Sequence, residues 1–512
     1  MQSSQIPFAQ TKRFSKLFLD YIEQKEALKP FYSSFPSLEN FDKIIQQKKI
    51  FKHRKILVER LESQYSEIEN RENVNKNLEL LKKENTFTIT TGHQLNIATG
   101  PLYFIYKIIT AINTCKSLKI AHPQYDFVPI YWMASEDHDY EEIKSFLLFG
   151  KNYIWNTQQY GAVGRFHLQE IEEILSELPE KIPVLEEAYK TSKNLSEATR
   201  KLVHQLFGKY GLVVLNADDT SLKHCFTPYL KQEIDFNTSH KTVTEQSDKL
   251  AQLGYPIQVN PREINLFYLK DNTRTRIIKE DGILKSLDGN IIVESPESHP
   301  ELYSPNVILR PLYQEVILPN LAYIGGPGEL AYWFQLKSMF EEFKVNFPVL
   351  MPRNHALVTT PSQVKKAEKL KISLSDLFND NQDIKSKYIK GHQKVLFELT
   401  TEKDKINLIF DKIKNKIITH DKSLLQAVEA ENHKMIKQIE TLEKRTYKSI
   451  ERSHEQGIKQ LENLKRKLFP KDSLQERVDN VFSFLINDTN FISKLIVELD
   501  AFNFKYYIIN NG

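Results

Sequence analysis

Cysteine is scarce in this chain of 512 residues. Its two cysteines, Cys115 and Cys225, lie far apart and outside any Cys-x-x-Cys spacing. Two separated thiols exclude a disulfide framework and a cysteine-rich zinc site. We therefore expect a protein of the reducing cytoplasm.

Long apolar runs are also missing. No stretch approaches the roughly 20 apolar residues of a membrane helix, and the first residues, MQSSQIPFAQTKRFSKLF, lack the apolar core and cleavage site of a signal peptide. The net charge of +4 is too small to indicate nucleic acid or a membrane as a partner. With 40% hydrophobic and 27% charged residues, the composition is that of a soluble globular protein.

Four short apolar stretches predict the strands of a sheet. Each is followed by polar or charged residues, as in TFTITTG, DFVPIYWMASEDHD, GLVVLNADD and FPVLMPRNH. Continuous apolar runs suit parallel strands that are covered on both faces, and ligands bind at the carboxyl ends of such strands. We expect an α/β fold whose parallel-sheet core is interrupted by inserted elements.

Changes of pattern along the chain indicate its organisation. In chain order we expect an N-terminal helical layer (1–84), a first part of the core (85–150), a helical connecting insert (151–208), a further part of the core (209–240), a small β-rich connecting insert with Asp-Gly turns (241–300), the last part of the core (301–360), a helical coiled coil (361–470) and C-terminal helices that dock on the body (471–512).

The coiled coil is predicted from apolar residues that recur at spacings of three and four between 406 and 468. Two long helices would fold back around THDKS. The segment has a surplus of lysine and arginine, which we interpret as its solvated face rather than a nucleic-acid surface.

The sequence TGHQLNIATGPLYFIYK predicts a strand that runs into a helix, with Cys115 on the apolar face of that helix. Gly92 and Gly100 bracket a loop whose backbone N–H groups could receive a phosphate or a carboxylate. The spacing matches neither GxxxxGK[ST] nor GxGxxG, and glycine also serves turn geometry alone, so both interpretations stay open. The candidate binding residues here are Thr91, Gly92, His93, Gln94, Gly100, Tyr103 and Lys107.

A second cluster, SEDHDYEE, directly follows an apolar strand. Crowded carboxylates perturb proton affinities, and a histidine between two aspartates suits acid/base work or the orientation of an amine or a metal. The alternative is an acidic helix N-terminus, which we adopt for the last two glutamates. The predicted catalytic residues are Asp137, His138 and Asp139, and the predicted binding residues beside them are Trp132 and Glu136.

A third cluster lies in SPNVILRPLYQEVILPNLAYIGGPGELAYWFQLK. The turn GGPGE at a helix start is either an anion or ribose platform or only a turn, and the two interpretations are even. Beyond FPVL, an arginine could clamp a phosphate or carboxylate bidentately, and His355 beside it is equally a hydrogen-bonded surface histidine. The candidate binding residues are Asn306, Arg310, Glu315, Gly325, Gly326, Gly328, Glu329 and Arg353.

Together the motifs TGHQLNIATGPLYFIYK, VPIYWMASEDHDYEEI, SPNVILRPLYQEVILPNLAYIGGPGELAYW and LQER resemble those of the bacillithiol-biosynthesis cysteine-adding enzyme family, BshC. The resemblance spans nearly the whole chain. It implies a Rossmann-like core akin to class I aminoacyl-tRNA synthetases, two connecting inserts and a long antiparallel coiled coil that forms a homodimer. It further implies a cytoplasmic ligase that joins cysteine to glucosaminyl malate in the last step of bacillithiol synthesis.

The resemblance also implies a mechanism. By analogy with the synthetase-like mycothiol ligase, ATP or another nucleotide would activate the cysteine carboxylate, and the sugar amine would then attack. The loop from Gly92 to Gly100 would stabilise developing charge, His93 would have a positioning role, and the aspartate–histidine cluster would orient the amine or accept its proton. No Lys-rich KMSKS-like loop is visible and no cysteine is placed to bind zinc, so nucleotide dependence stays open and no metal is predicted.

Two other classes of function remain as alternatives. The basic surplus of the coiled coil would suit an interaction or nucleic-acid-binding protein with a non-catalytic core, but the segment has few aromatic residues for stacking bases. A metal-dependent hydrolase could use the aspartates and histidine of SEDHDYEE together with His355.

Overall fold

The computed structural model describes the chain except residues 1, 49, 271 and 393–397. It divides into two compact units. The first comprises Met1–Leu357 and Ser473–Ile509, and the second comprises Val358–Asp472 and Asn510–Gly512. The chain crosses from the first unit to the second within strand β13 (His355–Thr359).

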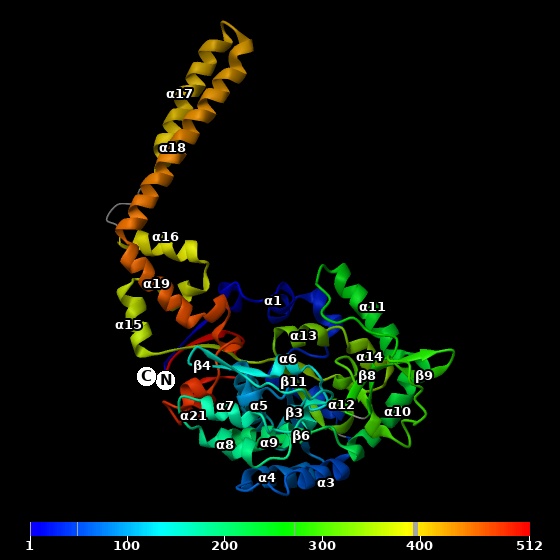
Figure 1. Ribbon diagram of the computed structural model, residues 1–512. Helices are drawn as coiled ribbons and strands as arrows, with labels where there is room; N and C mark the ends of the chain where they lie inside the picture. The colour runs from blue at the N-terminus through cyan, green and yellow to red at the C-terminus, as the bar shows by residue number, and fades with distance from the viewer. Residues whose placement is uncertain (1, 49, 271, 393–397) are drawn as a thin grey trace. The chain divides into compact units, whose positions relative to one another are not determined.

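The first unit contains a five-stranded parallel sheet in the order β12-β11-β2-β3-β6. Figure 1 labels β11, β3 and β6 of this sheet. Its strands are β2 (Thr86–His93), β3 (Asp126–Met133), β6 (Val213–Asn216), β11 (Asn320–Gly325) and β12 (Val349–Pro352). The chain starts in the middle at β2, runs outward through β3 and β6, and returns to the other side of β2 through β11 and β12. This order is that of a Rossmann-like sheet, with its topological switch point between β2 and β11.

The predicted fold class is therefore confirmed. All four apolar stretches form strands of the sheet, and the strand β11, which the sequence did not single out, lies between β12 and β2. Helix α5 (Tyr103–Ala121) packs on β2 and β3, and its Cys115 lies in a buried cluster with Phe87 and Ile324. Cys115 is thus a core residue, as its place on the apolar face of the helix predicted.

The N-terminal segment is not purely helical. It begins with a strand, β1 (Gln2–Ile6), and continues with α1 (Lys16–Ile22), α2 (Phe41–Lys48), α3 (Arg54–Gln64) and α4 (Glu72–Leu81). The C-terminal segment contains α20 (Phe482–Leu485) and α21 (Phe491–Glu498), and it ends in another strand, β14 (Tyr506–Asn510). β14 lies between β1 and β13 in a three-stranded sheet, so the two expected helical segments each contribute a strand that pairs across nearly the whole sequence.

Two inserts interrupt the core. The first consists of α6 (Tyr140–Ile143), β4 (Ser145–Leu148), β5 (Lys151–Ile154), α7 (Ile171–Glu177), α8 (Pro183–Lys190) and α9 (Leu195–Phe207). The second follows α10 (Thr220–Phe236) and α11 (Thr238–Gln252), and consists of β7 (Leu266–Lys270), β8 (Thr273–Glu280), β9 (Ile283–Ser286) and β10 (Tyr303–Pro305).

The β-rich insert is antiparallel, with the strand order β10-β7-β8-β9. Asp281 and Gly282 join β8 to β9, both with positive φ (49° and 79°), which is the turn chemistry expected of Asp-Gly in a hairpin. The domain boundary predicted at 241 falls inside α11, and the first strand of the insert begins at Leu266. The last part of the core adds α12 (Leu309–Ile317), α13 (Pro327–Trp333) and α14 (Lys337–Glu342).

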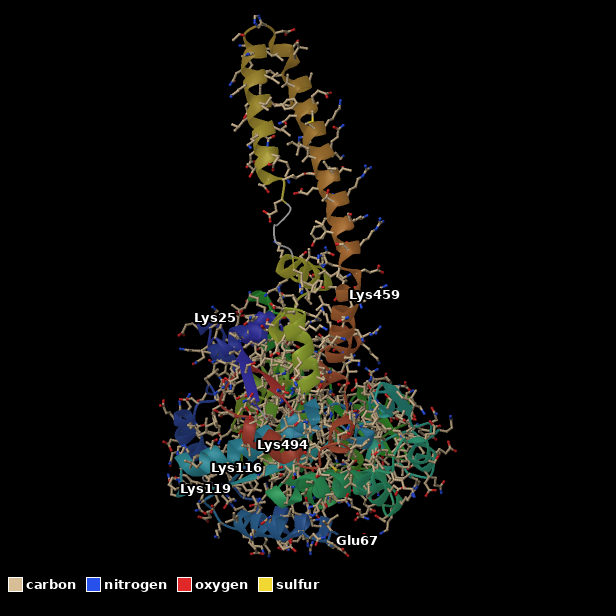
Figure 2. The ribbon with its side chains drawn as sticks, turned by 90° about the vertical axis from the view of Figure 1, so that its left-hand side faces the viewer. Lys25, Glu67, Lys116, Lys119, Lys459 and Lys494 are labelled. Atoms are coloured by element: carbon tan, nitrogen blue, oxygen red, sulfur yellow. The ribbon has the colours of Figure 1, made fainter. Side chains whose placement is uncertain are left out.

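The second unit is helical. Its helices are α15 (Pro361–Lys369), α16 (Asn381–His392), α17 (Thr400–Ile418), α18 (Leu425–Ser453) and α19 (Glu455–Leu468). Figure 2 shows α17 and α18 side by side as an antiparallel pair whose turn lies at the predicted THDKS. Within the described part of the chain, no helix has the length and apolar character needed to cross a membrane.

Candidate functional site

All five strands of the parallel sheet lead into one cavity of about 830 Å³. Gly92 lines it at the end of β2, and Asp137 lines it beyond β3. Ala217, Gly326 and Arg353 line it beyond β6, β11 and β12. The cavity therefore lies at the carboxyl edge of the sheet, across the switch point where ligands bind in this fold.

The three clusters singled out in the sequence meet at this cavity. The predicted residues that line it are Gly92, His93, Gln94, Tyr103, Trp132, Glu136, Asp137, His138, Asn306, Arg310, Gly326, Gly328, Glu329 and Arg353. The predicted residues outside the lining are Thr91, Gly100, Lys107, Asp139, Glu315 and Gly325. The structure thus brings most of the predicted residues to one cavity and places the others outside its lining.

Two backbone N–H groups at the far end of the loop after β2 are bonded within the protein. The Ala98 N–H donates to the Tyr189 hydroxyl at 2.7 Å, and the Leu102 N–H donates to the Asp479 carbonyl oxygen at 2.8 Å. Gly100, with a φ of 63°, supplies the turn between them. These N–H groups are closed to a ligand, whereas Gly92, His93 and Gln94 at the start of the loop line the cavity.

Lys107 acts behind the cavity, at the switch point. Its ammonium group is buried and donates to the Gly92 carbonyl oxygen and, at 2.8 Å, to Glu329. The other oxygen of the Glu329 carboxylate accepts the Gly326 N–H at 2.9 Å, so this ion pair ties the end of β2 to the start of α13. Burial lowers the pKa of Lys107, whereas Lys107 outweighs the effect of burial on Glu329 and lowers its pKa. Lys107 is a positioning residue, rather than the ligand contact that the sequence suggested.

Arg353 is a fixed cation at the cavity wall. Its guanidinium donates to the buried Glu476 at 2.8 Å, and the Nδ1 of His355 lies 2.7 Å from the same carboxylate oxygen. Burial would raise the pKa of Glu476, but Arg353 and His355 lower it to about 2. The motif LQER, which contributed to the family resemblance, thus supplies the counter-ion of Arg353.

His355 is fully buried, which corrects the interpretation of it as a surface histidine. Burial and the neighbouring Arg353 lower its pKa to about 4, so its ring is neutral at pH 7 and donates from Nδ1 to Glu476. It does not line the cavity. His355 therefore cannot complete a metal site with the aspartates after β3, and the described residues contain no cluster of His, Cys, Asp or Glu arranged to hold a metal.

Arg310 is part of the cavity wall. Its guanidinium sits over the rings of Trp132 and Tyr323, at 5.6 and 5.4 Å from their centres. Its Nη1 donates to Gln314 at 3.1 Å, whereas its buried Nη2 has no hydrogen-bond partner among the described residues. An arginine N–H left without a partner in a cavity wall is suited to an anionic ligand.

Glu315 contributes to the site only through its neighbours. Its buried carboxylate pairs with Lys48 at 2.8 Å and accepts from Asn320 at 2.6 Å. It also accepts at 3.0 Å from Gln314, the residue that bonds Arg310. Glu315 therefore positions Gln314, the hydrogen-bond partner of Arg310, and is not itself a binding residue.

Asp137 organises the turn after β3. One carboxylate oxygen accepts the backbone N–H groups of His138 at 2.8 Å and Asp139 at 3.3 Å. The other oxygen accepts from the Gln94 side chain at 2.9 Å, which links this turn to the end of β2. Asp137 lines the cavity but Asp139 does not, so the predicted catalytic trio is only partly assembled.

His138 is held by a residue that the sequence did not single out. Arg274 Nη1 lies 2.8 Å from the Nδ1 of His138. A guanidinium is always protonated and can only donate, so Nδ1 accepts and the neutral ring carries its hydrogen on Nε2. Burial and Arg274 lower the pKa of His138 against the opposing effect of Asp137 and Asp139. His138 is thus prepared to donate a hydrogen bond, and it is not prepared to accept the proton of an amine.

Glu136 provides a second carboxylate in the cavity wall. Lys223 Nζ lies 2.6 Å from it and 3.4 Å from Asp218, whose carboxylate also binds Arg165 at 2.8 Å. Burial raises the pKa of Glu136 even though Lys223 opposes the shift. Carboxylates with raised pKa in a cleft are candidates for proton transfer, so Glu136 joins Asp137 as a possible proton acceptor.

Several cavity residues were missed because they belong to the β-rich insert or to the C-terminal segment. They are Asn260, Arg262, Phe267, Arg274, Arg276 and Arg477. One signal was present, since the two arginines in RTRI alternate with other residues on a predicted strand and so share one face.

Comparisons with known proteins agree over the full chain. The N-terminal Rossmann-like domain model of "Bacillithiol biosynthesis BshC" matches residues 1–354, and the C-terminal coiled-coil domain model of the same family matches residues 356–511. A relative from Flavobacterium johnsoniae is 43% identical, with 97% of each chain covered, and one from Flavobacterium psychrophilum is 44% identical, with 94% of each covered. Both relatives are named "Putative cysteine ligase BshC". A solved tryptophanyl-tRNA synthetase from Plasmodium falciparum is 12% identical and covers 89% of this chain and 99% of its own, with a TM-score of 0.23, which is too low to support an argument.

Proposed function

The chain belongs to the BshC family of bacillithiol biosynthesis, and from this premise we propose that it is a ligase that joins L-cysteine to glucosaminyl malate through an amide bond. The observation that carries the proposal is the cavity at the switch point, which combines carboxylates with arginines. An amine needs a proton acceptor when it attacks, and Asp137 and Glu136 supply one. The carboxylate of cysteine needs cations, and Arg310 has an N–H without a partner.

The chemistry requires activation, because a carboxylate is a poor electrophile toward an amine at neutral pH. We propose that ATP activates the cysteine carboxylate as an acyl adenylate, with release of pyrophosphate. The acceptor amine then forms the amide bond and displaces AMP, and its proton passes to Asp137 or Glu136. His138, which donates from Nε2, orients an oxygen of the reacting groups, and Arg310 stabilises the negative charge that develops during transfer.

We propose that the protein acts in the cytoplasm as a homodimer through its second unit. The support is an apolar surface on the helical hairpin, where Leu408, Ile409 and Leu442 are 60%, 55% and 56% exposed. Exposed apolar side chains at this density along a helix pair are typical of a surface that another helix covers.

Deletion of the gene tests the proposed function in the cell. Cells without it should lose bacillithiol and accumulate glucosaminyl malate, and a plasmid copy of the wild-type gene should restore the thiol, as measured by mass spectrometry of cell extracts. A copy with Asp137→Ala should fail to restore it, while Lys249→Gln, on the exposed face of α11, should restore it fully. Normal bacillithiol in the deletion strain would refute the proposal.

A further inference from the structure

The β-rich insert turns a row of arginines toward the cavity. Arg274 and Arg276 are two residues apart on β8 and so lie on the same face of the sheet. Phe267 of β7 is directly opposite Arg276 in the ladder, and all three side chains line the cavity. The insert therefore forms a cationic wall facing the parallel sheet.

Arg274 fixes one positive charge in this wall. Besides His138, its guanidinium donates to the Ser304 hydroxyl at 3.2 Å and to the Pro305 carbonyl oxygen at 3.1 Å. It also lies 3.9 Å from the centre of the Phe267 ring. These contacts immobilise the guanidinium and use its N–H groups, so it contributes charge at a fixed position.

Hydrogen bonds to Asn265 fix the backbone of Arg262. Its N–H donates to the Asn265 side chain at 3.0 Å, and that side chain donates back to the Arg262 carbonyl oxygen at 2.8 Å. Asn265 is itself buried: its backbone N–H donates to the buried Glu233 at 3.1 Å, and its side-chain Oδ1 accepts from the Asn306 side chain at 2.9 Å. Buried polar groups of the fold thus hold the backbone of Arg262 at the cavity.

The guanidinium groups of Arg262 and Arg276 are available to a ligand. Both side chains line the cavity, and neither guanidinium has a hydrogen-bond or ion-pair partner in the part of the chain that the structure describes. Together with Arg274 they bring three like charges to the lining of this cavity. Planar guanidinium forks bind carboxylates and phosphates in pairs of hydrogen bonds, so two free forks match two neighbouring oxyanions.

We propose that Arg262, Arg274 and Arg276 form a subsite for a ligand with two neighbouring oxyanions, and that the dicarboxylate end of the malate-bearing acceptor fills it. The identity of this ligand rests on the proposed function. A nucleotide polyphosphate shares the same chemistry and is the other possible source. Because Arg274 also contacts His138, a dicarboxylate bound here directs the rest of the acceptor toward the turn that carries Asp137 and Glu136.

Calorimetric titration with L-malate and, separately, with ATP tests the subsite. The variant Arg262→Gln/Arg276→Gln should bind L-malate about tenfold more weakly or worse, because it loses two charge-assisted guanidinium forks; a tenfold loss corresponds to about 1.4 kcal/mol. Its affinity for ATP should stay within about twofold of wild type. The control Lys241→Gln/Lys249→Gln removes the same charge from exposed positions on α11 and should leave both affinities unchanged within about twofold.

The variant Arg262→Lys/Arg276→Lys keeps the charge but loses the planar forks, so its affinity for L-malate should fall between those of wild type and the glutamine variant. Unchanged malate binding in the glutamine variant would overturn the proposal. Loss of ATP binding in the glutamine variant, with malate binding unchanged, would also overturn the proposal. A wild-type protein that does not bind L-malate at millimolar concentration would overturn it as well. A wild-type protein that binds L-malate but forms no bacillithiol would refute the ligase function alone, whereas an unchanged KM for glucosaminyl malate in the glutamine variant would refute the subsite alone.

Discussion

Replacement of His355 by asparagine tests the buried network behind Arg353. Asparagine places an N–H donor near the position of Nδ1 and so retains a partner for Glu476, but it removes the titrating ring. The ring also packs against Phe8 and Phe14, with centres 5.3 and 4.8 Å away. At pH 7 the smaller side chain should cost about 2–4 kcal/mol of unfolding free energy, as for other large-to-small core substitutions.

The informative result is the pH dependence. Burial and Arg353 hold the pKa of His355 at about 4 against an ordinary value of 6.5. The unfolded chain therefore binds a proton between these values that the folded chain does not, and wild-type stability falls as pH drops from 6.5 to 4. This gap corresponds to about 3 kcal/mol. The deficit, which is the unfolding free energy of wild type minus that of His355→Asn, should therefore shrink by about 3 kcal/mol between pH 7 and pH 4.

Urea unfolding followed by tryptophan fluorescence measures this deficit, since Trp132, Trp155 and Trp333 all lie in the first unit. Glu476, with a pKa of about 2, stays ionised when folded across this range, so its protonation does not account for the difference. A deficit that is the same at pH 7 and pH 4 would refute the claim that His355 is held neutral by its surroundings.

Two further predictions concern the wall and the helical hairpin. Arg274→Gln should raise the pKa of His138 toward its ordinary value, because a nearby positive charge is removed. Nitrogen NMR shifts of the ring over a pH series would show this change, with Lys279→Gln on the same strand as the control. An unchanged titration would contradict the Arg274 contact from which the tautomer was assigned. Leu408→Glu/Ile409→Glu should convert a dimer to a monomer in sedimentation measurements, with cysteine-ligating activity then tested on the monomer; a dimer that persists would place the interface elsewhere.

The sequence was sufficient for the core of the fold because buried parallel strands leave continuous apolar runs. It was insufficient for β1 and β14, which pair across nearly the whole chain and are short, so no local pattern indicates their partner. β11 was missed because its apolar residues, NLAYI, continue from the apolar end of the preceding helix.

The functional site, too, could be predicted from the sequence only in part. Residue type and position along the chain were enough to single out Asp137, Arg310 and Arg353, and the structure places all three at one cavity. They could not show that Lys107 and Glu315 turn away from it into buried ion pairs, because the partners Glu329 and Lys48 lie more than two hundred residues away in sequence. The arginines of the insert were missed for the same reason, since only the folded chain brings that hairpin over the sheet edge.

The most direct test of the central claim is a reconstituted reaction of the purified protein with L-cysteine, glucosaminyl malate and ATP, beside an identical reaction without ATP, followed by mass spectrometry. Bacillithiol should appear together with AMP and pyrophosphate in the first reaction and be absent from the second. Failure to form bacillithiol in either reaction, with a folded protein that binds glucosaminyl malate, would contradict the assignment of this cavity to cysteine ligation.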